Sequence, residues 1–176
     1  LGFSAGILSD NLAEGLQNSI ITNLRFGMTY SSGAKINTDT MYTLSTSIGV
    51  IESELGTVKT NIPSRFGFGA ALTLNKTTTI VADYITQSFN DYEFDNRKSV
   101  NLKKYIKYGV GVEYHKGDVR STSFWEHLTL RGGLSFEQSH LTFGGTDINQ
   151  YSVYAGCSLP IGYENTIDLG FQYGIR

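Results

Sequence analysis

Apolar residues occupy every second position in several strand-length segments of this 176-residue chain. In residues 166–176, apolar side chains alternate with small, polar or charged ones along the whole segment. Successive side chains of a β-strand point to opposite faces of a sheet, so such a segment has one apolar face and one polar face. The alternation predicts strands at residues 21–31, 39–50, 64–75, 77–89, 102–116, 126–138, 149–160 and 165–176.

Two all-β structures explain alternation over so many strands. The first is a soluble barrel or sandwich with its apolar side inward, and the second is a membrane barrel with that side facing lipid. Glycine on the polar faces favours the membrane barrel. Glycine weakens strands and leaves nothing to pack, so a solvent-exposed face of a soluble barrel has little reason to carry it. The polar faces carry Gly27, Gly67, Gly69, Gly109, Gly111, Gly133, Gly170 and Gly174. Small residues mixed with charges are typical of a crowded interior, so we predict that the apolar face contacts lipid.

Composition agrees with a membrane barrel. The chain contains 20 Gly, 11 Tyr and 10 Phe but only 2 Pro. Many aromatic residues lie on the apolar faces near predicted strand ends, where they are expected to form girdles at the membrane interface, although strands are enriched in aromatic residues in any case. No apolar run is long enough for a transmembrane helix. A net charge of -2 and a pI near 5.9 give no basic surface for nucleic acid.

The sequence contains no recognisable catalytic motif. There is no nucleophile elbow, no phosphate-binding loop before a helix and no His/Cys set at metal-ligand spacing. His115, His127 and His140 are far apart in the sequence, and an acyl hydrolase would need the fold to bring one of them beside a serine. The single cysteine, Cys157, lies on an apolar face and is interpreted as a small hydrophobic residue. We therefore expect no enzyme activity, no cofactor and no metal site.

Connection lengths predict the direction of the strands. Tight turns are expected at Asn75-Lys76 and residues 161–165, long connections at residues 51–62 and 90–101, and a moderately long one at residues 138–148. The charged and aromatic connection at 90–101 is interpreted as a solvated loop, with a cover for the mouth or a partner contact as the alternative. Outer-membrane barrels have short periplasmic turns and longer external loops, so the last predicted strand runs outward.

An outward-running last strand predicts a larger barrel, because such barrels usually finish on the periplasmic side with an even number of strands. The start of the sequence has no basic region followed by an apolar core, so any signal peptide lies outside it. Residues 1–20 are expected to hold the end of a strand and a loop with a helical turn. We predict a single domain over residues 1–176: about eight strands of an antiparallel, up-and-down transmembrane β-barrel, as a fragment without the signal peptide and the final strand.

Glycine, aromatic and proline residues recur with a characteristic spacing at residues 63–71 (PSRFGFGAA), 81–84 (VADY), 108–114 (YGVGVEY), 130–136 (LRGGLSF), 155–162 (AGCSLPIG) and 167–176 (IDLGFQYGIR). On these motifs, residues 62–176 resemble the C-terminal part of the FadL/TodX family of outer-membrane transporters, in a form typical of Bacteroidetes-like bacteria. The resemblance implies a fourteen-stranded barrel in the bacterial outer membrane, with an N-terminal hatch and a further strand after Arg176. The hatch has no visible counterpart in this sequence.

Charged residues on the polar faces are the candidate ligand-binding residues. The predicted lumen-facing set is Arg25, Arg65, Asp83, Lys107, Glu113, Arg131 and Asp168, with Glu137 and Arg176 on the same side. Their more common role is a network of cross-strand ion pairs, because charges in a confined interior must be paired. The functional alternative is that Arg131 or Lys107 binds the carboxylate of an amphiphilic ligand whose tail lies along aromatic side chains.

The leading functional hypothesis is an outer-membrane channel for passive uptake of hydrophobic or amphiphilic small molecules, such as fatty acids and aromatic hydrocarbons. Its expected partners are outer-membrane lipid, a hydrophobic small-molecule ligand and other outer-membrane proteins, without nucleic acid. Two alternatives stay open. One is a structural or docking barrel within a secretion or surface protein assembly, and the other is a soluble ligand-binding barrel with its faces inverted.

Overall fold

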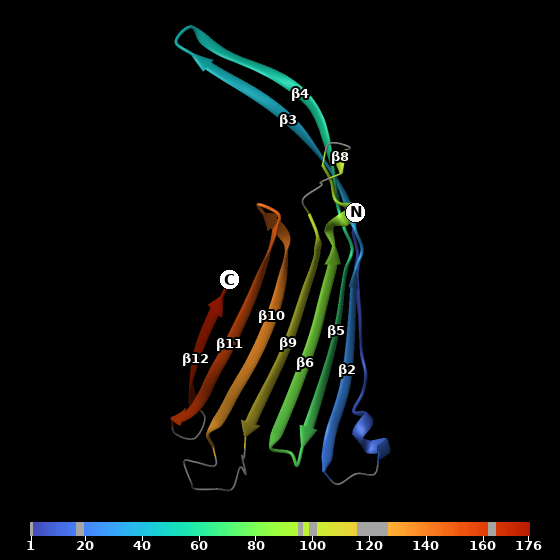
Figure 1. Cartoon of the computed structure of the whole chain (residues 1–176), viewed down its shortest axis with the longest axis vertical. Helices are drawn as coiled ribbons and strands as arrows, with labels where there is room; N and C mark the ends of the chain where they lie inside the picture. Colours follow the sequence, from blue (N-terminus) through green and yellow to red (C-terminus); the bar gives the residue numbers. More distant parts are fainter. Residues whose placement is uncertain (1, 17–19, 95–96, 99–101, 116–126, 162–164) are drawn as a thin grey trace.

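The computed structural model describes residues 2–16, 20–94, 97–98, 102–115, 127–161 and 165–176, and the fold is all-β and antiparallel (Figure 1). Eight strands form one sheet in the order β1-β2-β5-β6-β9-β10-β11-β12. Their bounds are β1 Ser4–Leu8, β2 Ile21–Ser31, β5 Arg65–Leu74, β6 Thr78–Ser88, β9 Lys104–His115, β10 Thr129–Phe143, β11 Thr146–Ile161 and β12 Asn165–Ile175. The prediction of an all-β, antiparallel fold is confirmed.

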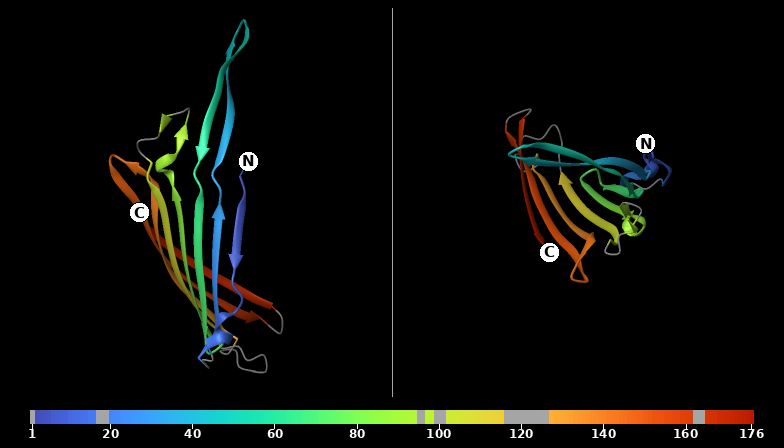
Figure 2. Two further views of the ribbon diagram at one scale, coloured as in Figure 1. Left: turned by 90° about the vertical axis from the view of Figure 1, so that its right-hand side faces the viewer. Right: turned by 90° about the horizontal axis from the view of Figure 1, so that it is seen from above.

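The eight-stranded sheet is strongly curved. Seen from above, its strands follow an arc from the N-terminal side to β12 (Figure 2). Every neighbouring pair is antiparallel, and in the described part of the chain β1 and β12 are the two outer strands. The sheet is therefore an open trough, and the strands described do not close on one another.

A second sheet stands beyond one end of the first. It contains β3 (Ala34–Thr46) and β4 (Gly49–Ile62), together with the two-residue strands β7 (Glu93–Phe94) and β8 (Arg97–Lys98). The hairpin of β3 and β4, with residues 47–48 at its tip, rises past the ends of β10 and β11 (Figures 1 and 2). This hairpin is called the arm below.

The arm corrects one prediction made from the sequence. The prediction of a long connection at residues 51–62 is wrong, because these residues form β4 and pair with β3 along nearly all of its length. Most residues of the hairpin are exposed, so neither strand needs a regular apolar face. Glu52 and Lys59 lie on one face of the hairpin, opposite Thr43 and Asn37, and a register shift between Thr40 and Met41 changes the phase of the alternation along β4.

Two other expected connections also differ from the structure. Most of residues 138–148 is strand, because β10 and β11 continue to a tight turn at Gly144 and Gly145, whose φ angles of 58° and 82° suit glycine. Residues 90–101 contain β7, β8 and part of a short 3-10 helix, Phe89–Asp91, and their remaining residues lie mainly outside the described part.

The N-terminal segment holds a strand end and a helical turn, as expected. A 3-10 helix, Leu12–Leu16, lies between β1 and β2. The Asn11 side chain fixes this connection, since its Oδ1 accepts hydrogen bonds from the backbone N–H groups of Ala13 and Leu24, and its Nδ2 donates to the Thr22 carbonyl. None of the helical turns in the described residues is long and apolar enough to cross a membrane.

The apolar face of the eight-stranded sheet is exposed. Phe171 and Leu130 keep 67% and 48% of their surface accessible. Among the described residues, Ala13 is the one apolar side chain larger than glycine that is buried, whereas the buried polar side chains Thr129, Ser152 and Ser158 lie on the polar face. The described strands therefore lack the packed apolar interior that the soluble alternative predicts.

A substitution at the base of the arm tests how closely its chain segments approach. A Cβ atom at Gly33 would lie 2.8 Å from the Ile62 carbonyl oxygen, while one at Gly170 would meet nothing within 4 Å. We expect Gly33→Ala to lower the free energy of unfolding by about 1–3 kcal/mol through overpacking. Urea unfolding in detergent measures the change, and equal stabilities for Gly33→Ala and the control Gly170→Ala would contradict the prediction.

Candidate functional site

Strand register aligns the charged residues on the polar face of the eight-stranded sheet. Glu113 lies opposite Arg131, and Lys107 lies opposite Glu137. Directly opposed residues of antiparallel strands share a face, and their side chains are close enough to interact. Across the sheet, the registers put every predicted ligand-binding residue on this one face. They are spread over six strands: Arg25 on β2, Arg65 on β5, Asp83 on β6, Lys107 and Glu113 on β9, Arg131 on β10 and Asp168 on β12.

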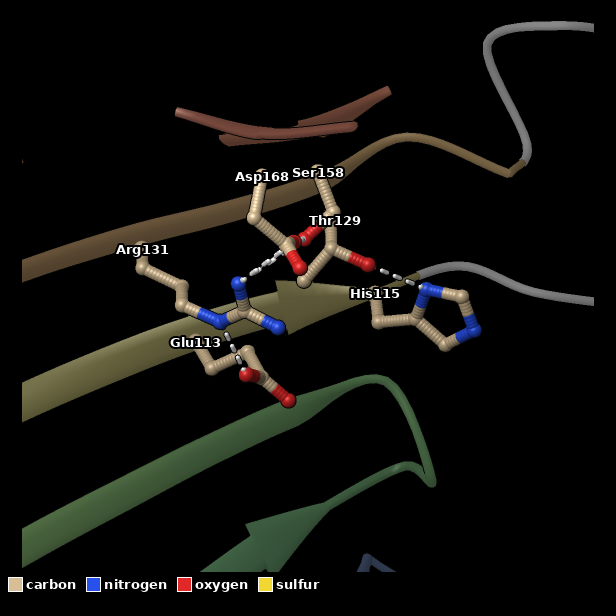
Figure 3. Close-up of polar contacts among 6 residues, drawn as sticks. All are labelled: Glu113, His115, Thr129, Arg131, Ser158 and Asp168. Atoms are coloured by element: carbon tan, nitrogen blue, oxygen red, sulfur yellow. Dashed lines mark hydrogen bonds and ion pairs between the residues drawn. The ribbon is translucent and has the colours of Figure 1, made fainter. Parts of the chain in front are cut away.

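Arg131 connects four adjacent strands (Figure 3). Its Nε donates a hydrogen bond to Glu113 Oε2 at 2.7 Å, and its Nη1 donates to Ser158 Oγ at 2.8 Å and lies 3.5 Å from Asp168 Oδ1. The Ser158 hydroxyl donates to the same Asp168 oxygen. These four residues are called the Arg131 network. One guanidinium thus lies between two carboxylates, and the hydroxyl links the guanidinium to the second of them.

Two buried hydroxyl groups lie opposite each other on β10 and β11, at or beside the Arg131 network. Ser158 belongs to it, and Thr129 lies opposite Ser158 and forms a 2.8 Å hydrogen bond with His115 Nδ1 (Figure 3). Sequence reasoning did not single out Ser158 or Thr129. A signal was present, because the alternation of β11 places Ser152 and Ser158 on the polar face, but short hydroxyl side chains carry no charge that draws attention to them.

A second group of polar contacts lies toward the arm end of the same sheet. Lys107 Nζ is 3.6 Å from Glu137 Oε2, and both side chains are half-buried. Arg176 Nε donates to Gln150 Oε1 at 2.9 Å. Lys103, just before β9, pairs with Asp147 at 2.5 Å. The structure therefore forms cross-strand ion pairs with several of the predicted residues, while binding of a ligand by those residues stays a prediction.

Arg25, Arg65 and Asp83 form neither an ion pair nor a hydrogen bond within the described ranges, so the structure does not bring them into either group. Asp83 instead lies across the neighbouring strand, above Gly109. A Cβ atom at Gly109 would collide with the Asp83 carboxyl group, so glycine is needed there for the carboxylate to lie flat on the sheet.

The polar face is hollow. A cavity of about 750 Å³ lies over β6, β9, β10, β11 and β12, with Asp83, Lys107, Arg131 and Asp168 among its lining residues and glycines along its floor. A second, of about 440 Å³, lies over β1, β2, β5 and β6. No group of His, Cys, Asp or Glu side chains suited to a metal ion occurs in the part of the chain that the structure describes.

Aromatic rings form a row across the opposite, apolar face. Tyr84 and Tyr108 have ring centroids 5.0 Å apart, Tyr108 and Phe136 are 6.3 Å apart, and Phe136 and Tyr151 are 5.0 Å apart. Phe68 lies directly opposite Tyr84 and continues the row onto β5. Cys157 lies on the same face as this aromatic row, opposite Leu130, and is a free cysteine as expected.

Removing the charge of Arg131 tests whether the Arg131 network holds the strands together. Arg131→Gln leaves Glu113 and Asp168 without their cation, so we expect a lower unfolding temperature and a smaller effect at high salt. Arg25→Gln is the control, because Arg25 is also exposed on this face but forms no ion pair or hydrogen bond with any residue that the structure describes. Thermal unfolding of both variants in detergent measures the difference. A loss as large for Arg25→Gln as for Arg131→Gln would show that the ion pairs are not responsible.

A protein-family model described as BamG matches residues 8–176. No curated protein matches the chain. The expected membership of the FadL/TodX family is therefore wrong. The motifs on which that resemblance depended are alternating glycine and aromatic residues, and unrelated barrel strands share this pattern because each has one crowded face and one lipid-facing face.

Proposed function

The chain belongs to the BamG family, and from this membership we propose that it is a component of the machinery that assembles outer-membrane proteins. The observation that carries the proposal is the family match, which extends over residues 8–176. The hypothesis of an uptake channel for hydrophobic small molecules is wrong, because this family is associated with outer-membrane protein assembly. The alternative of a structural or docking component fits better. We propose that it acts without catalysis, through contacts with other outer-membrane proteins.

We further propose that the eight-stranded sheet lies in the outer membrane as part of a β-barrel wall. Its support is the exposed apolar face, which is far more extensive than the isolated apolar patches of soluble monomers. Alternate outward positions from Ile106 to Tyr114 cover about 26 Å of strand. This length is comparable with the apolar band, about 25 Å tall, on outer-membrane barrels.

The aromatic row gives the proposed wall a boundary. It crosses β5, β6, β9, β10 and β11 at one level toward the arm end of the strands. Rings with an apolar body and a polar edge are stable where hydrocarbon meets headgroups, so this row marks one membrane interface in the proposal. The arm then begins beyond this interface, because β5 starts at Arg65, on the arm side of Phe68.

In this arrangement the polar face lines the inside of the wall. Its ion pairs are shielded from lipid by the strands themselves, and they connect β9, β10, β11 and β12. Their proposed role is to hold the wall in register, since an antiparallel pair that slips by one residue turns every apolar side chain inward. We propose a structural role for the Arg131 network.

Depletion of the protein tests the proposed function. If it takes part in outer-membrane protein assembly, the amounts of several unrelated outer-membrane β-barrel proteins should fall together as the protein is depleted. Quantitative mass spectrometry of isolated outer membranes measures these amounts. Inner-membrane proteins are the control and should not change. Unchanged barrel levels after full depletion would contradict the assembly role.

Cysteine labelling tests the proposed orientation of the wall. Leu134 and Ser135 are neighbours on β10 and point to opposite faces. In a Cys157→Ala background, a fluorophore on Leu134→Cys should be quenched by brominated lipid, whereas Ser135→Cys should not be quenched and should react with a water-soluble thiol reagent. Fluorescence in reconstituted vesicles measures both. Equal quenching at the two positions would disprove the orientation.

A further inference from the structure

Within the described residues, the arm is joined to the rest of the molecule at its base. Between its base and its tip, β3 and β4 pair with each other, and the pairing of β4 with β7 is confined to Thr60 and Asn61. The arm extends further from the tight-turn end than any other described segment, and from above it crosses the mouth of the curved sheet toward the β11–β12 side (Figures 1 and 2). A two-stranded hairpin standing alone is marginally stable in water.

The outer half of the arm has one uncharged apolar face. Register places Leu44 directly opposite Ile51, and Tyr42 lies on the same face two residues before Leu44. At the tip, Ile48 exposes 97% of its surface, in a turn where asparagine, aspartate or glycine is usual. Tyr42, Leu44, Ile48 and Ile51 are called the arm face.

The opposite side of the arm is acidic. Thr43 and Glu52 face each other there, as do Ser45 and Val50. Residues 39–57 contain Asp39, Glu52 and Glu54 but no lysine or arginine. This charge keeps the second face in water and disfavours contact with phosphate-bearing lipid headgroups. The outer half of the arm is thus amphipathic, and within the described residues nothing covers its apolar side.

Lipid cannot cover the arm face if the aromatic row marks the membrane interface. The thirteen residues of β3 carry it about 40 Å from its base, and the arm face lies in the outer part of that length. The headgroup layer is only about 5–8 Å thick on each side of the hydrocarbon. Hydrocarbon therefore lies far below the arm face, and a protein surface remains as the apolar cover.

We propose that the arm face docks into an apolar recess on another protein of the outer-membrane assembly machinery, with the acidic side left toward solvent. This inference rests on the proposed function, which supplies the class of partner. The geometry of the arm then places that partner over the mouth of the curved sheet (Figure 2). The exposed tip residue Ile48 is the expected centre of the contact, since central buried apolar side chains contribute most at interfaces.

Two matched double variants of the full chain test the inference. Leu44→Ser with Ile51→Ser removes two side chains of the arm face, which are 42% and 60% exposed. Met41→Ser with Val50→Ser removes two side chains of the opposite face, which are 59% and 62% exposed. Each tagged variant is purified from isolated outer membranes, and the assembly proteins that co-purify with the unaltered chain are quantified.

We expect the arm-face variant to recover about ten-fold less of these assembly proteins, as for loss of interface hot-spot contacts, and the control variant to recover nearly the normal amount. Equal amounts of both variants in the outer membrane verify that they fold. Equal recovery of partners by the two variants, whether normal or reduced, would overturn the inference.

Cross-linking identifies the occupant directly. With Cys157→Ala, a photoreactive probe on Ile48→Cys should form an adduct with one of the co-purifying assembly proteins. An adduct with a second copy of this chain, or with lipid alone, would overturn the inference. If the unaltered chain recovers no assembly protein, the proposed function fails together with the inference. If it recovers them and both double variants do so equally, only the arm inference fails.

Discussion

The structure depends on one constraint: the strands of the large sheet keep the same two-residue alternation in register, with the apolar side chains together on one exposed face. Leu134, Val110 and Val153 lie opposite one another on adjacent strands and are all exposed. A slip of one residue in any pair would put these side chains among the charges of the other face. The hollows, the ion pairs and the aromatic row all follow from that fixed register, because each is formed by residues aligned across several strands.

Alternation identified most of the sheet but could not identify the arm. The predicted strand at 21–31 coincides with β2, and the one at 165–176 ends one residue beyond β12. Such strands can be recognised in the sequence because one face carries apolar side chains and the other carries small, polar or charged ones. In the arm, a register shift between Thr40 and Met41 changes the phase of β4 relative to β3, so alternation read along residues 51–62 does not show one continuous strand.

The sequence predicted which residues share the polar face, but it did not predict which of them contact one another. Alternation along each strand placed Glu113, Arg131 and Asp168 on the polar side, but they come from three strands, and only the register shows that one guanidinium reaches both carboxylates. The family was misjudged for a related reason. The glycine and aromatic spacing reports the environment of a strand, and that environment is shared by proteins with different roles.

The Arg131 network and the Lys107–Glu137 pair make the sheet mechanically uneven. Ionic cross-links join β9 to β12, whereas β1, β2, β5 and β6 are linked in the described part by backbone bonds and neutral hydroxyl contacts such as Ser4 with Ser31. The arm emerges from β2 and β5, in this second half, where Gly27, Gly67 and Gly69 lie side by side. A load on the tip of the arm therefore acts first on the half of the sheet whose described strands carry no ionic cross-links.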